Sequence, residues 1–281
     1  MKYKIIHESD YTFDSKVFIE PHYFRFKTRT TPFHKVENSD LQIHPNPVGL
    51  SEVSDIEGNI VHLAWFEGLH DKLSIHSTSI VEITEYNPFN FILYPVEFNK
   101  VPFKYSNQQL DLLRNALQAL DISDQLIDYG KEISKKANAN TTEFLTELTR
   151  KIQNEFSLIY RHEGPPQDPD KTFRDREGSC RDLAWMQIQL LRNIGIASRF
   201  VSGYYYLPLE KPDYELHAWL EVFLPGAGWI GFDPSHGIIT GSTHIPIAVS
   251  SIPENTMPVT GTVRGTALSK LKTNLSIEPI E

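Results

Sequence analysis

Residues 178–195 read Gly-Ser-Cys-Arg-Asp-Leu-Ala-Trp-Met-Gln-Ile-Gln-Leu-Leu-Arg-Asn-Ile-Gly. The apolar positions after the aspartate recur at helical spacing, which predicts a largely buried helix. Gly195 is a suitable residue to end it, because helices often finish in a left-handed conformation that glycine adopts without strain. Cys180 therefore falls at or near the first turn of this helix.

Cys180 is the only cysteine of the chain. A lone cysteine is usually a small buried hydrophobe. At a helix start, however, unsatisfied N–H groups and the helix dipole favour the thiolate, and a backbone N–H can also donate to an oxyanion. The position of Cys180 therefore suits a nucleophile better than a core filler. A single thiol also excludes an intramolecular disulfide and is compatible with a reducing cytosol.

A thiol nucleophile needs a base, and a base needs a group that fixes its tautomer. His217 opens a predicted strand over 217–224, and Asp233 ends another over 228–233. The glycine-rich loop between them predicts a hairpin, which would place His217 beside Asp233. Each residue also has a simpler interpretation, because His217 could be a strand-end histidine in solvent and Asp233 a turn residue before Pro234. The three residues together nevertheless predict a nucleophile–base–orienter triad of Cys180, His217 and Asp233.

The elements around the triad predict an α+β fold. Alternating apolar residues indicate strands through the first hundred residues, and prolines at 87–102 mark a junction. Helices are predicted from the Ser106 capping box to Leu120, over 125–137 and from Asn140 to Phe156. The remaining segments are a loop over 161–178, a strand over 197–207, loop-rich chain after 240 and a last strand near 271–277. We therefore predict a β-rich domain at 1–100, a catalytic domain at 101–250 and an extension at 251–281.

Composition narrows the function further. The formal net charge of −9 argues against nucleic acid as a partner, since phosphate binding needs clustered Lys and Arg. No stretch approaches the length of apolar residues that spans a membrane, and the N-terminus shows no secretory signal. We therefore expect a cytoplasmic protein that acts on a peptide, protein or small amide. We expect neither a cofactor nor a metal, because paired ligand spacings such as CxxC or HExxH are lacking.

The sequence resembles the transglutaminase-like superfamily, whose core is papain-like. The resemblance covers about residues 155–240 and rests on four pieces in the family's order: Arg-Glu-Gly-Ser-Cys-Arg-Asp (176–182), Asn-Ile-Gly-Ile-Ala-Ser-Arg-Phe-Val-Ser-Gly-Tyr (193–204), His-Ala-Trp-Leu-Glu-Val (217–222) and Gly-Trp-Ile-Gly-Phe-Asp-Pro-Ser (228–235). It implies that Cys180 is the nucleophile, His217 the base and Asp233 its partner. The N-terminal half also resembles the β domain that precedes this core in many bacterial members.

The sequence departs from the family in three places. Ala197 stands where many relatives have proline, and Ser235-His236 stands where Thr-Asn is common. The segment 250–258 departs more, which leaves open how the C-terminal region recognises a substrate. The second oxyanion donor is also open between Tyr160 and Gln153. Four tyrosines could line an acyl-binding cleft or simply pack in the fold, namely Tyr204, Tyr205, Tyr206 and Tyr214.

Four functions are compatible with these residues. The favoured one is hydrolysis of a peptide or amide through a thioester on Cys180. The same triad could instead transfer the acyl group to an amine, as a transglutaminase does, if the site excludes water. The fold could also be a binding module that retains the triad. A fourth interpretation takes Cys180, His217, Asp233 and one of His236 or His244 as zinc ligands.

Overall fold

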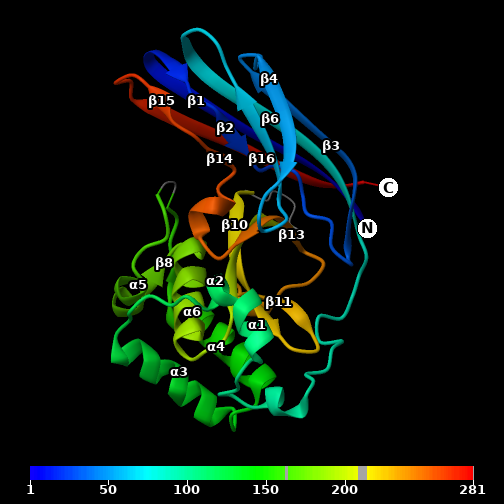
Figure 1. The fold of residues 1–281 in the computed structure, drawn as a ribbon, viewed down its shortest axis with the longest axis vertical. Helices are drawn as coiled ribbons and strands as arrows, with labels where there is room; N and C mark the ends of the chain where they lie inside the picture. The colour runs from blue at the N-terminus through cyan, green and yellow to red at the C-terminus, as the bar shows by residue number, and fades with distance from the viewer. Residues whose placement is uncertain (162–163, 208–213, 281) are drawn as a thin grey trace.

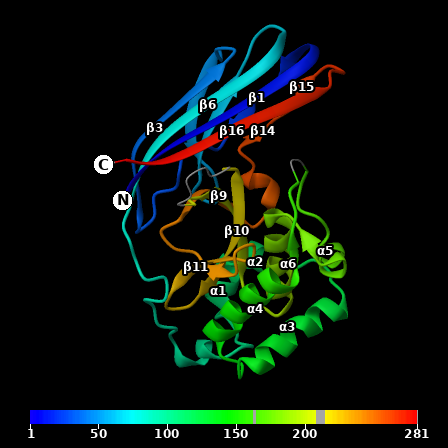
Figure 2. The ribbon, with the colours of Figure 1, turned by 180° about the vertical axis from the view of Figure 1, so that it is seen from behind.

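A computed structural model describes residues 1–161, 164–207 and 214–280. Its β-rich part lies above a body in which helices pack against a separate sheet (Figure 1). The two ends of the chain lie near each other at one edge of the β-rich part in both views (Figures 1 and 2). The helices and antiparallel strands of the structure confirm the predicted α+β class. In the described part of the chain, no helix is both long and apolar enough to cross a membrane.

Two antiparallel sheets form the β-rich part. One follows the order β15-β1-β6-β3, with β16 also paired to β1, and the other follows β14-β2-β5-β4. The strands of the first are β1 (Lys2–Ile19), β3 (His34–His44), β6 (His70–Ile83), β15 (Val263–Arg264) and β16 (Ser269–Ile280). Those of the second are β2 (His22–Phe24), β4 (Gly49–Ser54), β5 (Ile60–Trp65) and β14 (Val259–Thr260). Burial alternates along β1 and β6, as period-two patterns predict for strands with one covered face.

The last strand returns to the first one. β16 runs antiparallel along β1, from the pair Lys2–Ile280 to the pair Phe13–Ser269. The predicted final strand near 271–277 is thus present, and it belongs to the N-terminal sheet. The segment after residue 250 consequently crosses from the core into the β-rich part.

The helices of the body mostly follow the predicted caps. They are α1 (Asn107–Leu112), α2 (Arg114–Leu117), α3 (Asp124–Lys136), α4 (Thr141–Glu155), α5 (Pro169–Asp175) and α6 (Cys180–Asn193), with 3-10 turns η1 (Val96–Asn99) and η2 (Pro253–Thr256). Ser106 forms its capping box, and the Asn140 side chain accepts the Glu143 N–H. The helix predicted to reach Leu120 is wrong in extent, because it breaks at Leu113 and ends at Leu117.

Two further predictions need correction. The predicted loop over 161–178 contains α5, whose start is fixed by Asp168 as the N-cap and Pro169 at the first helical position; residues 162 and 163 lie outside the described residues. The same stretch supplies β8 (Glu177–Gly178), which pairs in parallel with β7 (Ser157–Leu158). The chain after 240 is less loop-rich than predicted, because β13 (His244–Ser250) is a buried strand.

The sheet of the body has the order β12-β11-β10-β9-β13 and is antiparallel. Its other strands are β9 (Ser198–Tyr205), β10 (Leu216–Leu224), β11 (Gly228–Asp233) and β12 (Ile238–Ile239). β10 and β11 form the predicted hairpin, with Leu224 paired to Gly228. Both Gly226 and Gly228 have a positive φ, the conformation that this tight turn requires.

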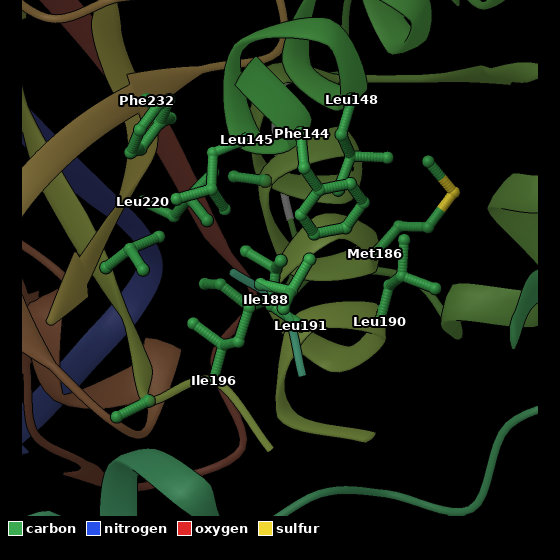
Figure 3. Close-up of a cluster of buried hydrophobic side chains, with 14 of the residues drawn as sticks. Phe144, Leu145, Leu148, Met186, Ile188, Leu190, Leu191, Ile196, Leu220 and Phe232 are labelled. Carbon is green, nitrogen blue, oxygen red and sulfur yellow. The ribbon is translucent and has the colours of Figure 1, made fainter. Parts of the chain in front are cut away.

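Helix α6 lies in the middle of the hydrophobic core (Figure 3). Its apolar residues meet α4 and the sheet in one cluster that includes Phe144, Leu145, Leu148, Met186, Ile188, Leu190, Leu191, Ile196, Leu220 and Phe232. Burying each large apolar side chain stabilises the fold by roughly 1.5–3 kcal/mol. The N-terminus of α6 is therefore held rigidly against the sheet.

A second buried cluster joins the body to the β-rich part. Tyr204, Ile245 and Ile247 of β9 and β13 pack with residues of β1, β6 and β16, namely Tyr3, Ile5, Val81, Ile83 and Ile277. The His7 ring, from β1, also hydrogen-bonds the Tyr204 hydroxyl at 3.1 Å. Continuous apolar packing across the boundary fixes the two parts relative to each other.

Candidate active site

Cys180 is the first residue of α6, as predicted, and it is half-buried. Ser179 precedes the helix as its N-cap, and the Asp182 carboxylate accepts both the Ser179 N–H and the Ser179 hydroxyl, at 2.8 and 2.7 Å. Gly178 is needed beside them, because a Cβ there would lie 2.8 Å from the Cβ of Asp182. The turn that presents the thiol is thus fixed by three neighbours in sequence.

Asp182 also ties a distant loop to this turn. Its side chain is fully buried and accepts from Arg161 Nη2 and from the Gln167 N–H, both at 2.7 Å. Burial opposes ionisation of this carboxyl, but the hydrogen bonds from Gln167, Ser179 and Arg161 outweigh it and lower its pKa. Asp182 is therefore an ionised anchor beneath the first turn of α6.

The β10–β11 hairpin places His217 beside Asp233. His217 Nε2 lies 2.7 Å from Asp233 Oδ2, and the other carboxylate oxygen accepts the Ser235 N–H at 2.9 Å. Cys180 and His217 lie close enough for each to shift the pKa of the other, and Nδ1 is the ring nitrogen that remains for the thiol. The structure thus brings together all three residues of the predicted triad, with the imidazole between the sulfur and the carboxylate.

The charges of the triad support one another. Burial raises the pKa of the Cys180 thiol, but His217, the Ala218 backbone N–H and Arg181 together bring it below its ordinary value. Burial acts against the His217 imidazolium, yet the Asp233 carboxylate and Cys180 raise the pKa of His217 to about 10. The pKa of Asp233 is held well below its usual range, because its histidine partners outweigh burial. A thiolate–imidazolium pair is the expected state of Cys180 and His217 near neutral pH.

Asp233 has two more histidine partners, which sequence reasoning did not assign to it. His236 Nδ1 and His244 Nε2 lie 2.8 and 3.1 Å from the same Oδ2 atom that contacts His217. Burial lowers the pKa of His244, so this ring stays neutral and donates its N–H to the carboxylate. The apolar run that follows His244 could have indicated a buried strand, but its contact with Asp233 depends on β13 pairing with β9.

The group of possible metal ligands in the structure differs from the set that the zinc interpretation named. His217, Asp233 and His236 each offer one atom, and these atoms lie within 4.8 Å of one another. Cys180 does not belong to this group. His217 Nε2 and His236 Nδ1 already hydrogen-bond Asp233 Oδ2. A metal ion bound to these atoms would therefore have to replace the contacts that orient His217.

Two cavities meet at His217. The first, of about 460 Å³, lies between the two parts of the chain. Its walls come from β1, β16, the 253–259 segment, the Tyr160–Arg161 loop and the start of β10. The second, of about 480 Å³, is lined by Tyr160, Tyr205, Leu207, Tyr214, Glu215, Leu216, His217 and His236. Segment 250–258, whose role the sequence left open, thus supplies part of a cavity wall.

Of the four tyrosines that could line a cleft, two line a cavity and two pack in the fold. Tyr214 lines both cavities, whereas Tyr205 lines the second and packs its ring against His236, with 4.2 Å between ring centroids. Tyr204 is buried between the two parts of the chain, and Tyr206 packs on Tyr3 with centroids 4.7 Å apart.

The two oxyanion candidates lie in different places. Tyr160 lines both cavities. The Gln153 side chain lies close to Gly237, where an added Cβ would be 3.0 Å from that of Gln153, and Gln153 is not among the residues that line either cavity. Tyr160 is therefore the better placed of the two.

Comparison with known proteins finds relatives of this chain and a solved structure with the same fold. A 25%-identical uncharacterized protein of Mycobacterium tuberculosis matches 88% of this chain and 82% of its own length. A protein-glutamine gamma-glutamyltransferase of Pseudomonas aeruginosa is 26% identical over 48% of this chain and 20% of its own. The crystal structure of a proposed cysteine protease from Cytophaga hutchinsonii has the same fold, with a TM-score of 0.72 and 21% identity over 100% of this chain and 92% of that one.

Two family models match separate parts of the chain. The transglutaminase-like superfamily model matches residues 127–234, which include Cys180, His217 and Asp233. The model of the bacterial transglutaminase-like N-terminal region matches residues 3–82, which contain β1 to β6. The chain therefore belongs to the transglutaminase-like superfamily and carries the bacterial N-terminal region ahead of its core.

Proposed function

We propose that the protein is a thiol enzyme that cleaves a peptide or amide bond through a thioester on Cys180. The observation that carries this proposal is the position of His217, which lies 2.7 Å from Asp233 Oδ2 and near enough to Cys180 for the two side chains to shift each other's pKa. A cysteine that only fills space in the core would not need a histidine beside it. Thiol catalysis requires a base next to the nucleophile and an orienting group next to the base.

In the first half-reaction, the Cys180 thiolate attacks the carbonyl carbon of the amide. The Cys180 N–H is among the first-turn donors of α6 that have no partner within the helix, and it can stabilise the oxyanion that forms. Tyr160, on the cavity wall, is our candidate for the second donor. The C–N bond then breaks, and the His217 imidazolium gives its proton to the departing amine. The product is a Cys180 thioester beside a neutral His217.

In the second half-reaction, His217 accepts a proton from water as the water oxygen attacks the thioester carbonyl. The C–S bond breaks and releases a carboxylic acid, and Cys180 and His217 return to the thiolate–imidazolium pair. Asp233 keeps the ring oriented throughout and stabilises its charged form. Both cavities reach His217, so both the acyl group and the water have access to the triad.

Transfer to an amine is the alternative outcome of the same thioester. The relative from Pseudomonas aeruginosa is named as a protein-glutamine gamma-glutamyltransferase, and an amine could enter where water does. We propose hydrolysis as the main reaction, on a peptide, protein or small amide in the cytoplasm. Neither nucleic acid nor a membrane is part of this proposal.

Labelling followed by a substrate screen tests the proposal. An electrophilic amide probe should add one equivalent to the wild type and none to Cys180→Ala. Short peptides should then be incubated with each protein, with and without a primary amine, and the products identified by mass spectrometry. Cleavage by the wild type alone, with an acid as product, supports hydrolysis. An amine adduct as the main product would instead indicate transfer, and an unlabelled wild-type thiol would contradict both.

A further inference from the structure

Arg181, the cation next to the nucleophile, helps to lower the pKa of Cys180 but takes no part in the bond-making and bond-breaking steps above. Arg181 follows Cys180 in α6, and its half-buried side chain lines the cavity between the two parts of the chain. Its guanidinium donates from Nη2 to the Arg161 carbonyl. Among the described residues, no carboxylate forms an ion pair with Arg181. A half-buried positive charge that no ion pair with a carboxylate neutralises is costly unless a ligand supplies the carboxylate.

Arg161, the neighbouring arginine, differs from Arg181 because it forms an ion pair with a carboxylate. Its Nη2 and Nε atoms donate to the buried Asp182 carboxylate, at 2.7 and 3.3 Å. The charge of Asp182 is therefore already engaged by Arg161, by Ser179 and by the Gln167 N–H. Arg181 precedes Asp182 in the chain, but it forms no ion pair with that carboxylate among the described residues, and it lines the cavity.

The carboxylates that line the same cavity do not neutralise Arg181. Glu215 and Glu254 are both among the lining residues. Burial raises the pKa of the Glu215 carboxyl, which is the opposite of what a nearby guanidinium would do. Glu254 sits in η2, away from the start of α6 in sequence, and forms no ion pair with Arg181 among the described residues. The Arg181 end of the cavity is thus cationic.

The rest of the cavity suits a small, partly apolar molecule. Its volume of about 460 Å³ lies within the range of roughly 300–1,000 Å³ for small-molecule sites. Leu271 and Leu275 of β16 line one side, and Met257 and Pro258 line another. The β-rich part therefore contributes a wall of the site, so the cavity exists only where both parts of the chain are present.

We infer that Arg181 binds a carboxylate of the substrate, and that the substrate is a short amide whose carboxylate lies within a few bonds of the scissile carbonyl. This inference rests on the proposed function. The carboxylate could belong to the acyl side or to the leaving amine, because both flank the carbonyl that Cys180 attacks. Guanidinium is well suited to this task, since its planar fork matches a carboxylate with two hydrogen bonds.

Alkylation of Cys180 tests carboxylate binding without any substrate. Iodoacetate carries a carboxylate and iodoacetamide a neutral amide, and both react with the same thiolate. The ratio of their rate constants therefore cancels changes in thiolate population. We expect Arg181→Gln to lower the iodoacetate-to-iodoacetamide ratio about tenfold, as for loss of a charged hydrogen bond. Arg181→Lys should keep most of the ratio, and Arg174→Gln, whose exposed side chain is outside the cavity lining, should keep all of it.

Salt provides a second readout that needs no variant. In the wild type, the ratio should fall as sodium chloride screens the guanidinium. A ratio that is unchanged by salt and within twofold of the wild type in Arg181→Gln would overturn the inference. If Arg181→Gln does not fold, Arg181→Lys and the salt series decide the matter.

Matched peptides distinguish the two sources of the carboxylate. One pair differs by glutamate against glutamine on the acyl side, and the other by a free carboxylate against a carboxamide on the leaving side. The wild type should prefer the acid in one pair about tenfold in kcat/KM, and Arg181→Gln should lose that preference. Cleavage without either preference would overturn the inference and leave the proposed function intact. An Arg181-dependent alkylation ratio with no peptide cleaved would support carboxylate binding by Arg181 and count against the proposed function.

Discussion

Two buried carboxylates flank Cys180, and their partners differ in kind. Asp182, beneath the first turn of α6, accepts from a guanidinium, a hydroxyl and backbone N–H groups. Asp233, at the end of β11, accepts from three histidine rings. Both side chains are fully buried, and both have a lowered pKa.

The difference lies in which donors can lose a proton. The donors to Asp182 keep their protons near neutral pH, so that carboxylate holds the loop and the helix start in one arrangement. Imidazole titrates near neutral pH when unperturbed, so the region around Asp233 can change its charge during a reaction. We therefore expect Asp182 to support the architecture of the site and Asp233 to support its proton transfers. Substitutions should separate the two roles.

The largest effect on chemistry should follow from removing the thiol. Cys180→Ala should abolish covalent labelling and turnover completely, because no other cysteine exists in the chain. The half-buried side chain is small, so the thermal unfolding midpoint should change little. Mass spectrometry after treatment with the electrophilic probe measures covalent labelling, and circular dichroism measures the thermal unfolding midpoint. A residual adduct or residual turnover in Cys180→Ala would place the chemistry elsewhere.

Asp233→Asn should reduce the rate severely and leave the fold intact. An amide could present its N–H₂ to His217 and stabilise the wrong tautomer, and it removes the charge that favours the imidazolium. We expect kcat/KM to fall about 10–1000-fold, less than in a serine triad because a thiol is intrinsically more nucleophilic. The measurement is kcat/KM against pH for both proteins. Equal activity at every pH would reduce Asp233 to a turn residue before Pro234.

Asp182→Asn should instead act on stability. Removing one member of a buried ion pair costs about 3–5 kcal/mol, here because Arg161 would lose the carboxylate with which it forms an ion pair. The folded-state pKa of Asp182 is lowered, so its contribution is complete above the unfolded pKa of about 3.9 and is lost as pH falls through the folded value. Urea unfolding of both proteins between neutral and acidic pH measures this. A variant as stable as the wild type at pH 7 would remove Asp182 from the architecture.

The sequence allowed much of this site to be predicted. Local signals placed Cys180 at the start of α6 and His217 beside Asp233 in a hairpin, because both depend on nearby residues. His236 and His244 were not assigned to Asp233. The contact of His244 requires β13 to lie beside β9, and Pro246 within that segment weakens the strand pattern.

The parts of the fold that could not be predicted share this cause. The pairing of β16 with β1 joins the two ends of the chain, so no local pattern contains it. The cavity that Arg181 lines depends on that pairing, since β16 supplies one wall. The missed helix α5 differs, because Asp168 followed by Pro169 is a helix-start signal that the prolines before it obscured.

The smallest effect should come from His236, which is partly exposed. In His236→Ala, Asp233 keeps two histidine donors and the Ser235 N–H. Loss of one hydrogen bond should then lower kcat/KM by about twofold to tenfold. His217→Ala is the control with complete loss of the base. A decrease in His236→Ala as large as that in Asp233→Asn would show that His236 takes part in orienting His217.

The most direct test of the central claim is the rate of Cys180 alkylation by iodoacetamide as a function of pH. Because the chain has one cysteine, every modified molecule reports on this thiol. The lowered pKa of Cys180 beside His217 predicts rapid alkylation well below the ordinary thiol pKa of about 8.5, with the rate falling only as pH drops through the lowered value. His217→Gln should move this profile to higher pH. A wild-type thiol that reacts only at alkaline pH, with the same profile in His217→Gln, would contradict the thiolate–imidazolium pair.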